Sequence, residues 1–230
     1  MIRRFAAAAA ALSLLVAATP AGSAAPDSWD GLSRISSKRF DAVYLLPGAD
    51  FRGYTRIMLD PTEVAFQKNW LRDYNQRADF SARMSDADAQ KLLDRVRTGF
   101  EQVFEKAYSK AGYPITTTPG PDVIRVRTGV LNLSVVAPDQ MTPGRSATFS
   151  RQAGGASLII EARDSLTGAL LGRAVDSQSI GDDGMRLRNS VTNRAAFEQV
   201  FDRWAKISVE GLAELKTRSP IAGPTTAAAQ

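Results

Sequence analysis

The 230-residue sequence contains neither cysteine nor histidine. Without cysteine the chain forms no disulfide framework, and it lacks the residue to which a bacterial lipoprotein attaches its lipid. Without histidine, Ser-His-Asp and Cys-His catalysis are excluded, as are zinc sites that depend on imidazole or thiolate. The composition therefore argues against an enzyme, and we predict no catalytic residue, no cofactor and no metal ion.

Clustered charge and long apolar runs are also scarce. No basic patch with interleaved aromatic residues is present, so we do not expect nucleic acid as a partner. Beyond the N-terminus no stretch is apolar enough to span a membrane. Loss of residues 1–24, which include Arg3 and Arg4, lowers the formal net charge from +5 to +3. We expect a soluble mature protein.

The N-terminus has the order of a secretory signal peptide. Arg3 and Arg4 supply the positive region, residues 5–18 form a short apolar run, and small residues follow. A retained membrane anchor is the alternative, but the run is shorter than the roughly twenty residues that a span needs. We predict a signal peptide over residues 1–24, cleaved after Ala24, and hence a periplasmic or secreted protein without a lipid anchor.

The rest of the chain reads as one domain. Residues 25–218 contain no linker-like composition and no internal repeat. Residues 219–230 are small, uncharged and rich in proline, and we expect them to form a disordered tail.

Two amphipathic helices are predicted. Ser85 and Asp88 form a capping box at the start of the first. Apolar residues follow at spacings of three and four until Gly112 ends the helix. The second helix is expected to begin near Ser190 or Thr192, and its apolar stripe includes Trp204.

Short β-branched stretches predict the strands, at residues 54–59, 123–136, 156–163 and 169–178, with 62–66 a possible continuation of the first. Residues 164–168 between the last two are typical of a hairpin connection. Within 123–136 the apolar residues change parity, which indicates a β-bulge, and we place it at Gly129.

This order of elements predicts an α+β fold. The sequence β-α-β-β-β-α favours a two-layer sandwich, in which a mixed four-stranded sheet carries two helices on one face. The first helix would connect two parallel strands, and the remaining strands would extend the sheet in antiparallel fashion.

The segment 66–80 is the main candidate for a binding surface. Four aromatic residues alternate there with charged and amide groups, a mixture that is enriched at protein interfaces. We predict partner binding through Trp70, Arg72, Tyr74 and Phe80. The alternative is that Trp70 and Phe80 only cover the core.

Two further functions remain open. Asp60, Glu63 and Asp164 lie near strand ends, so a hydrolase or lyase that uses carboxylates alone is conceivable if they converge. A carrier of a small apolar ligand would instead need a cavity between the sheet and the helices. Residues 182–184, Asp-Asp-Gly, contain only a fragment of a calcium loop and are better explained as a turn.

Several motifs resemble the DUF3313 family of bacterial exported proteins. They include residues 44–51 (YLLPGADF), 119–122 (PGPD), 163–168 (RDSLTG) and 203–205 (RWA). The motifs follow one another in the order found in the family, and the resemblance extends over nearly the whole mature chain. The resemblance implies an envelope protein of unknown function, in many members a lipoprotein, and supplies no catalytic residues. Because this sequence has no cysteine to acylate, it departs from the lipoprotein pattern.

Our leading hypothesis from the sequence is therefore a periplasmic, non-enzymatic protein that binds another envelope protein or a cell-wall component. The sequence does not specify its oligomeric state.

Overall fold

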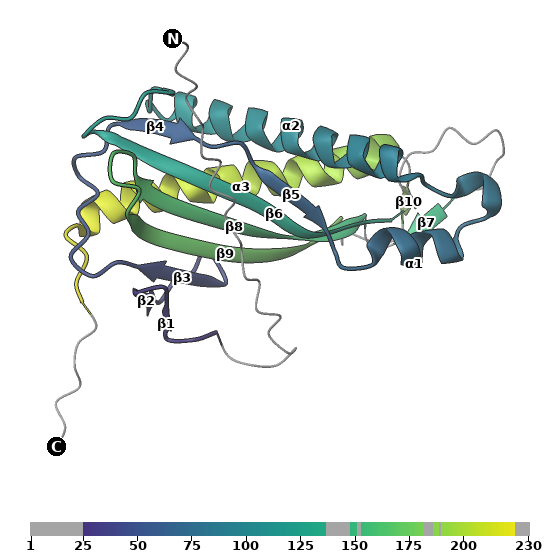
Figure 1. The fold of residues 1–230 in the computed structure, drawn as a ribbon, viewed down its shortest axis with the longest axis horizontal. Coiled ribbons are helices and arrows are strands. Elements are labelled where there is room, and N and C mark those ends of the chain that lie inside the picture. The colour runs from purple at the N-terminus through teal and green to yellow at the C-terminus, as the bar shows by residue number, and fades with distance from the viewer. Residues whose placement is uncertain (1–24, 137–147, 151–152, 182–185, 189, 224–230) are drawn as a thin grey trace, which may run out of the picture.

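The computed structural model of the chain describes residues 25–136, 148–150, 153–181, 186–188 and 190–223. The expected signal peptide, residues 182–184 and residues 224–230 lie outside this part of the chain. The fold is α+β, as predicted, with a mixed sheet covered by helices (Figure 1).

Ten strands, three α-helices and one short 3-10 helix are present in the described residues. The strands of the main sheet are β1 (Ser28–Trp29), β2 (Leu32–Ile35), β3 (Ala42–Leu45), β4 (Arg56–Leu59), β5 (Glu63–Phe66), β6 (Val123–Val135), β8 (Gly154–Asp164) and β9 (Leu170–Ile180). Strands β7 (Thr148–Ser150) and β10 (Arg186–Arg188) form a separate pair. The helices are α1 (Trp70–Arg77), η1 (Phe80–Ala82), α2 (Asp86–Lys110) and α3 (Ser190–Arg218).

The main sheet has eight strands, so the prediction of four is wrong. Its order is β1-β2-β3-β9-β8-β6-β4, and β5 also pairs with β6. The three strands β1 to β3 were not predicted, because they have only two to four residues each and show no clear alternation. Strands β4 and β5 both run parallel to β6, which confirms the parallel connection through the first long helix.

The bulge in β6 lies three residues beyond the predicted position. Gly129 stays in register with Ile159 of β8, and the register shifts between Leu131 and Ser134. Asn132 at this point has a φ of 52°, a left-handed conformation that asparagine adopts more readily than most residues. The bulge lets the strand bury Val130 and Leu133 on one face although their spacing is odd.

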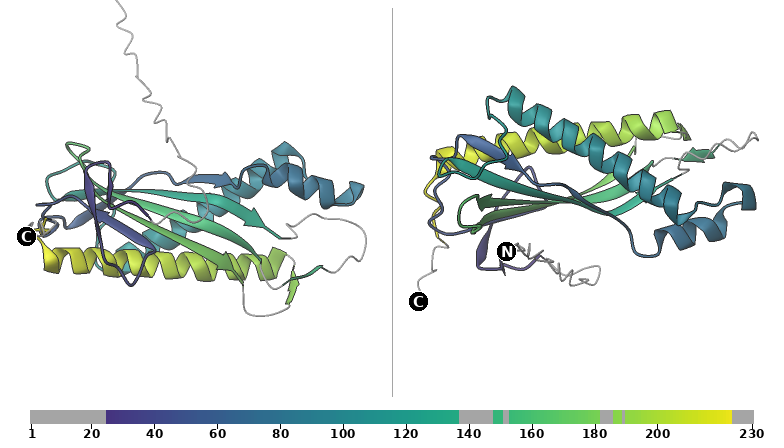
Figure 2. Two further views of the ribbon diagram at one scale, coloured as in Figure 1. Left: turned by 90° about the horizontal axis from the view of Figure 1, so that it is seen from below. Right: turned by 45° about the horizontal axis from the view of Figure 1, so that its top comes forward.

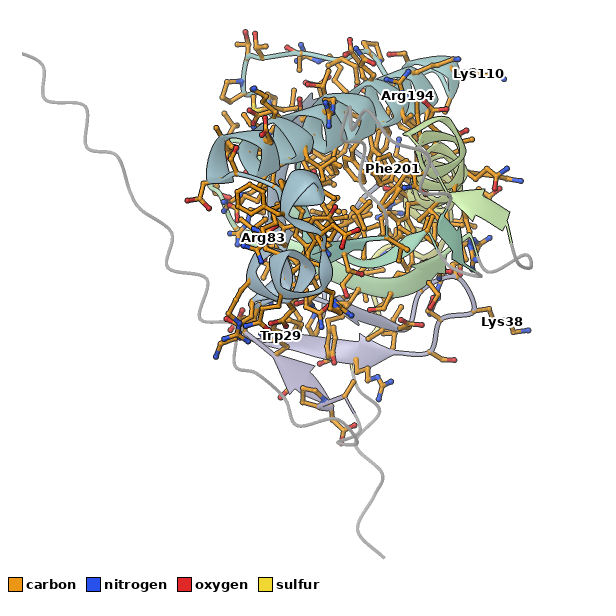
Figure 3. All side chains as sticks on the ribbon, turned by 90° about the vertical axis from the view of Figure 1, so that its right-hand side faces the viewer. Trp29, Lys38, Arg83, Lys110, Arg194 and Phe201 are labelled. Atoms are coloured by element: carbon orange, nitrogen blue, oxygen red, sulfur yellow. The ribbon has the colours of Figure 1, made fainter. Side chains whose placement is uncertain are left out.

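Helices α2 and α3 pack side by side on one face of the sheet, as predicted (Figure 2). The Ser85 hydroxyl accepts a hydrogen bond from the Asp88 N–H, so the capping interaction at the start of α2 is confirmed. The aromatic rings of Phe100 on α2 and Phe201 on α3 meet edge to face, with centroids 5.3 Å apart. Phe201 points into the interior between the helices and the sheet (Figure 3).

One hydrogen bond ties α3 to the centre of the sheet. The indole N–H of Trp204 donates to the carboxylate of Asp176 on β9 at 2.7 Å. Both side chains are buried, with 0% and 2% of their surface exposed. The amide of Gln178 donates a second hydrogen bond to Asp176, so this buried carboxylate is held by neutral donors.

The C-terminal end of α3 is fastened separately. Ser219 accepts a hydrogen bond from the backbone N–H of Phe51, and Ile221 exchanges backbone hydrogen bonds with Gly48 and Ala49. Ile221 is buried. The segment that we expected to be a disordered tail thus begins with residues that pack against the domain. None of the helices in the described residues combines the length and the apolar character that a membrane crossing needs.

Replacing Trp204 by phenylalanine should destabilise the fold strongly. The change keeps most of the aromatic volume but leaves the buried Asp176 without its closest donor, which costs about 1–3 kcal/mol or more for a charged group. The control is Trp29→Phe, because Trp29 is 36% exposed and its indole N–H has no comparable role. Urea unfolding of both variants measures the difference, and equal losses of stability would contradict this account of Trp204.

Candidate functional site

A cavity of about 300 Å³ lies between α3 and the sheet. We call it the α3 cavity. Its walls are mainly apolar side chains of β3, β6, β8, β9 and α3, including Val43, Leu45, Val126, Ile160, Leu212 and Leu215. The volume is at the lower end of the range of small-molecule sites.

The cavity exists because small residues occupy positions that face the helix. Ala162 on β8 is in register with Gly172 on β9, and Ala174 lies two residues further along the same strand. Gly211 lines the cavity from α3, where a β-carbon would touch nothing closer than the Phe40 ring at 3.8 Å. A rigid helix cannot move into the space that such small side chains leave, so the volume stays open.

The entrance is formed by the loop of residues 36–40, which connects β2 to β3. Ser37 shapes this loop by accepting hydrogen bonds from the backbone N–H groups of Arg39 and Phe40. Arg39 then forms ion pairs with Glu210 and Glu214 of α3. These side chains are about 40% exposed, so the ion pairs contribute only about 0–1 kcal/mol. The loop is held in addition by Phe40, which is partly buried and packs against the core.

Two buried hydroxyl groups lie in the wall of the α3 cavity. Tyr108 of α2 and Ser208 of α3 both line the cavity, and their oxygens are 2.6 Å apart. Burial raises the pKa of Tyr108 to about 12, so its phenol keeps its proton at neutral pH. Both residues are buried, at 2% and 7% exposure.

The four residues predicted to bind a partner fall into two groups: Trp70 and Tyr74 make contacts inside the domain, and Arg72 and Phe80 are exposed. Trp70 is buried and stacks on Phe66, with ring centroids 4.2 Å apart, and on Tyr74, at 5.6 Å. The Tyr74 hydroxyl donates to the carbonyl of Ala82. These two candidates therefore stabilise the α1 region, as the alternative explanation held for Trp70.

The other two candidates of this segment reach solvent. Arg72 is exposed and pairs with its neighbour Asp73. Phe80, on η1, has 87% of its surface exposed, and the guanidinium of Arg83 lies 5.7 Å from its ring centroid. The alternative explanation, that Phe80 covers the core, is wrong for this residue, because 87% of its surface is exposed.

The face of the sheet opposite the helices carries ion pairs rather than a free charged patch. Arg125 and Arg127 both contact Asp60, at 2.8 and 3.3 Å, and Arg127 also contacts Glu63 at 3.5 Å. Each arginine here is thus balanced by a carboxylate on a neighbouring element. An anionic polymer would have to displace these internal partners in order to bind.

A second cluster on the same face is centred on Arg173. Its guanidinium bonds Glu161 at 2.6 Å and Asp30 at 2.8 Å, and the Trp29 ring covers it with the centroid 4.1 Å away. Burial raises the pKa of Glu161, but hydrogen bonds from Arg173 and Arg163 outweigh this and leave it below its ordinary value. The cluster holds β1 against the sheet.

The three carboxylates of the hydrolase hypothesis do not converge. Asp60 and Glu63 share Arg127 on the open face of the sheet. Asp164 instead closes the β8–β9 hairpin, where the backbone N–H of Thr167 lowers its pKa, and it also accepts a hydrogen bond from the Tyr54 hydroxyl. A general acid needs a carboxyl group with a raised pKa, so this arrangement gives the hypothesis no support.

No group of three or more carboxylates that could hold a metal ion occurs in the part of the chain that the structure describes. The Asp-Asp-Gly sequence at residues 182–184 falls outside it.

The α3 cavity was not predicted residue by residue. A signal was nevertheless available, since Gly211 interrupts an otherwise large apolar stripe, and Ala162 and Ala174 occupy inward-facing positions of long strands. Small residues on a buried face leave part of the space between the sheet and the helix without side-chain atoms. What the sequence could not show is that these positions lie opposite one another.

The sequence matches the family model DUF3313, a protein of unknown function, over residues 21–207. The chain belongs to this family, as its motifs predicted. No functionally curated protein matches the sequence.

Several solved structures are distantly similar. The PelC dodecamer from Paraburkholderia phytofirmans is 11% identical, with 70% of this chain and 95% of that chain covered and a TM-score of 0.34. A DUF330 protein from Xanthomonas campestris is 10% identical, with 75% and 89% covered and a TM-score of 0.41. A minor lipoprotein from Acinetobacter baumannii is 12% identical, with 70% and 94% covered and a TM-score of 0.29. Likenesses this distant carry no conclusion about function.

Substitutions in the 66–80 segment should separate its buried from its exposed aromatic residues. Trp70→Ala removes a buried ring from a three-ring stack and is expected to cost about 3–5 kcal/mol of stability. Phe80→Ala should change stability by less than about 1 kcal/mol, because its ring is exposed and has only the weak contact with Arg83. Denaturant unfolding of the two variants tests this, and a large loss of stability in Phe80→Ala would show that the ring packs more tightly than described.

Proposed function

We propose that the protein is an exported envelope protein that binds a small apolar molecule in the α3 cavity. The observation that carries the proposal is the cavity itself, a largely apolar space of about 300 Å³ that small residues keep open. The expected signal peptide over residues 1–24 places this binding in the periplasm or outside the cell. The envelope component that we expect as a partner is, on this proposal, a small molecule.

The volume limits the size of the ligand. An apolar cavity of about 150 Å³ accepts benzene, so twice that volume has room for a two-ring aromatic compound or a chain of roughly ten carbon atoms. A phospholipid with two long chains would not fit. Transfer of such a ligand from water is favourable by about 25 cal/mol per Å² of apolar surface that becomes buried.

The fold is suited to admitting such a ligand. The entrance loop of residues 36–40 is held by exposed ion pairs of Arg39, whereas α3 is anchored at Trp204 and at Ser219. Separation of the Arg39 ion pairs therefore costs little and leaves α3 in place, and full opening of the loop would also withdraw Phe40 from the core. Because binding occurs without a chemical step, the absence of histidine and cysteine is no obstacle.

Binding should be lost when the α3 cavity is filled from the helix. The probe is 2-methylnaphthalene, an apolar compound without a hydrogen-bonding group, and its own fluorescence reports binding to the mature domain. We expect saturable binding to the wild type and none to Gly211→Leu, whose added side chain occupies the space next to Phe40. This variant should be as stable as the wild type or more stable, since leucine is favoured over glycine in a helix by about 0.8 kcal/mol.

The matched control is Ala213→Leu, two residues along α3 and exposed. It introduces the same side chain outside the cavity and should bind the probe like the wild type. Absence of saturable binding to the wild type, or equal binding to Gly211→Leu, would contradict the proposed function.

A second candidate function is docking of a protein partner at η1. The observation that favours it is the nearly complete exposure of the Phe80 ring, one of few large apolar side chains so exposed in the described residues. Arg72 offers a charged group on the neighbouring helix α1. Because Trp70 and Tyr74 make contacts within the α1 region, this second proposal assigns the contact to Phe80 and Arg72.

Phe80→Ala should then weaken capture of an envelope protein by the immobilised mature domain. The control is Leu166→Ala, which removes another exposed apolar side chain, at the β8–β9 hairpin. Quantitative mass spectrometry of the captured proteins measures the outcome. A protein lost in Phe80→Ala but kept in Leu166→Ala supports docking at η1, and identical profiles for both variants and the wild type count against it.

A further inference from the structure

The hydroxyl pair of Tyr108 and Ser208 in the wall of the α3 cavity has an unused hydrogen. Each hydroxyl group has one hydrogen to donate and can accept two hydrogen bonds. In the pair of Tyr108 and Ser208, one hydroxyl donates to the other. The hydroxyl that accepts therefore keeps its own hydrogen, and among the described residues nothing else takes it.

Ser208 differs from the other hydroxyl residues near the end of α3 in the partner of its hydrogen bond. A serine within a helix commonly donates to the carbonyl of the residue four positions earlier. Thr217 and Ser219 at the end of α3 do so, to Ala213 and Leu215. Ser208 bonds Tyr108 instead, so its hydroxyl is directed to the side of α3 that lines the cavity.

Leaving a buried donor unpaired is costly. The penalty is about 1–3 kcal/mol, and it is recovered when an acceptor of a ligand or a water molecule meets the donor. Tyr108 and Ser208 are both more than nine-tenths buried, and both line the α3 cavity. The arrangement is that of a largely apolar pocket with one buried polar point in its wall.

We propose that the ligand of the α3 cavity is an apolar molecule that carries one neutral hydrogen-bonding oxygen, bound by the hydroxyl pair of Tyr108 and Ser208. This inference rests on the proposed function and specifies the class of ligand. The oxygen belongs to an alcohol, a ketone, an ester or another neutral group.

An ionised carboxylate fits the hydroxyl pair less well. Burial of a charge without a cationic partner is strongly unfavourable. Lys38, Arg39 and Arg218 also line the cavity, and two of these are already paired with Glu214. Arg173 contributes to the lining too, but its guanidinium is engaged by Glu161 and Asp30. The hydrogen bond that joins Tyr108 and Ser208 involves only neutral hydroxyl groups.

The test compares 2-naphthol with 2-methylnaphthalene, which differ only by a hydroxyl in place of a methyl group. The measured quantity is the ratio of their dissociation constants, in the wild type and in Tyr108→Phe/Ser208→Ala. This double variant removes both hydroxyls together, so it leaves no unpaired partner. We expect the preference for 2-naphthol to fall about ten-fold in the double variant, the value of one neutral hydrogen bond, while 2-methylnaphthalene binds unchanged or more tightly.

Binding of 2-methylnaphthalene also shows that the variant is folded. Should the double variant not fold, Tyr108→Phe alone is measured, and a smaller fall in the same direction is expected because one hydroxyl remains. An unchanged ratio would overturn the inference while leaving the proposed function intact, and it is the result expected if a bound water already satisfies the pair. Failure of both probes to bind the wild type would instead overturn the proposed function. Tighter binding of 2-naphthoate than of 2-naphthol would overturn the assignment of a neutral oxygen.

Discussion

The hydrogen bond between Trp204 and Asp176 fixes where α3 lies on the sheet, and most other features of the molecule depend on that placement. The bond is buried on both sides and joins the middle of a 29-residue helix to a central strand. Around it, the rings of Phe100 and Phe201 fill the space between the two long helices. Beyond Ser208 some of the facing residues are small, among them Ala162, Gly172 and Ala174, and there the helix lines the α3 cavity together with larger apolar side chains.

The α3 cavity persists because the helix α3 is attached to the domain on both sides of the cavity. Trp204 secures the helix on one side, and Ser219 and Ile221 secure its C-terminal end through residues 48–51. Collapse of the cavity would require bending a continuous helix or breaking one of these attachments. The loop of residues 36–40 is held by exposed ion pairs, by two hydrogen bonds to Ser37 and by the partly buried Phe40, which packs against the core. On this account, ligand binding requires the exposed ion pairs of Arg39 to separate while α3 keeps its place.

Elements with a long, regular pattern could be predicted from the sequence. The helix that begins after Ser85 and the β8–β9 hairpin lie where local signals place them, because capping and turn chemistry act within a few residues. Strands β1 to β3 were not found in this way, since two to four residues carry too little periodicity. Strands β4 and β5 are equally short, but they were found because the apolar stretches 54–59 and 62–66 are marked off by Asp60 and Pro61. The bulge at Asn132 was misplaced because glycine at 129 seemed the more permissive residue, whereas asparagine also adopts a left-handed backbone.

The candidate site was harder to predict, for a physical reason. A cavity depends on residues that are distant in sequence and meet only in the fold, such as Ala162, Gly172 and Gly211. The aromatic segment 66–80 attracted attention because its residue types are typical of interfaces, yet the stack of Phe66, Trp70 and Tyr74 is satisfied internally. Composition identifies residues that are able to bind, and burial decides which of them are free to do so.

As a member of a family without an assigned function, the chain has to be understood from its own geometry. The most direct test of the central claim is a crystal structure of the mature domain with a brominated ten-carbon alcohol, in which the anomalous signal locates the bromine. The account predicts a single strong bromine peak between α3 and the sheet, near Gly211 and Ala174, with the hydroxyl at Tyr108 and Ser208. Bromine peaks only on the outer surface, with α3 unchanged over an empty cavity, would contradict it.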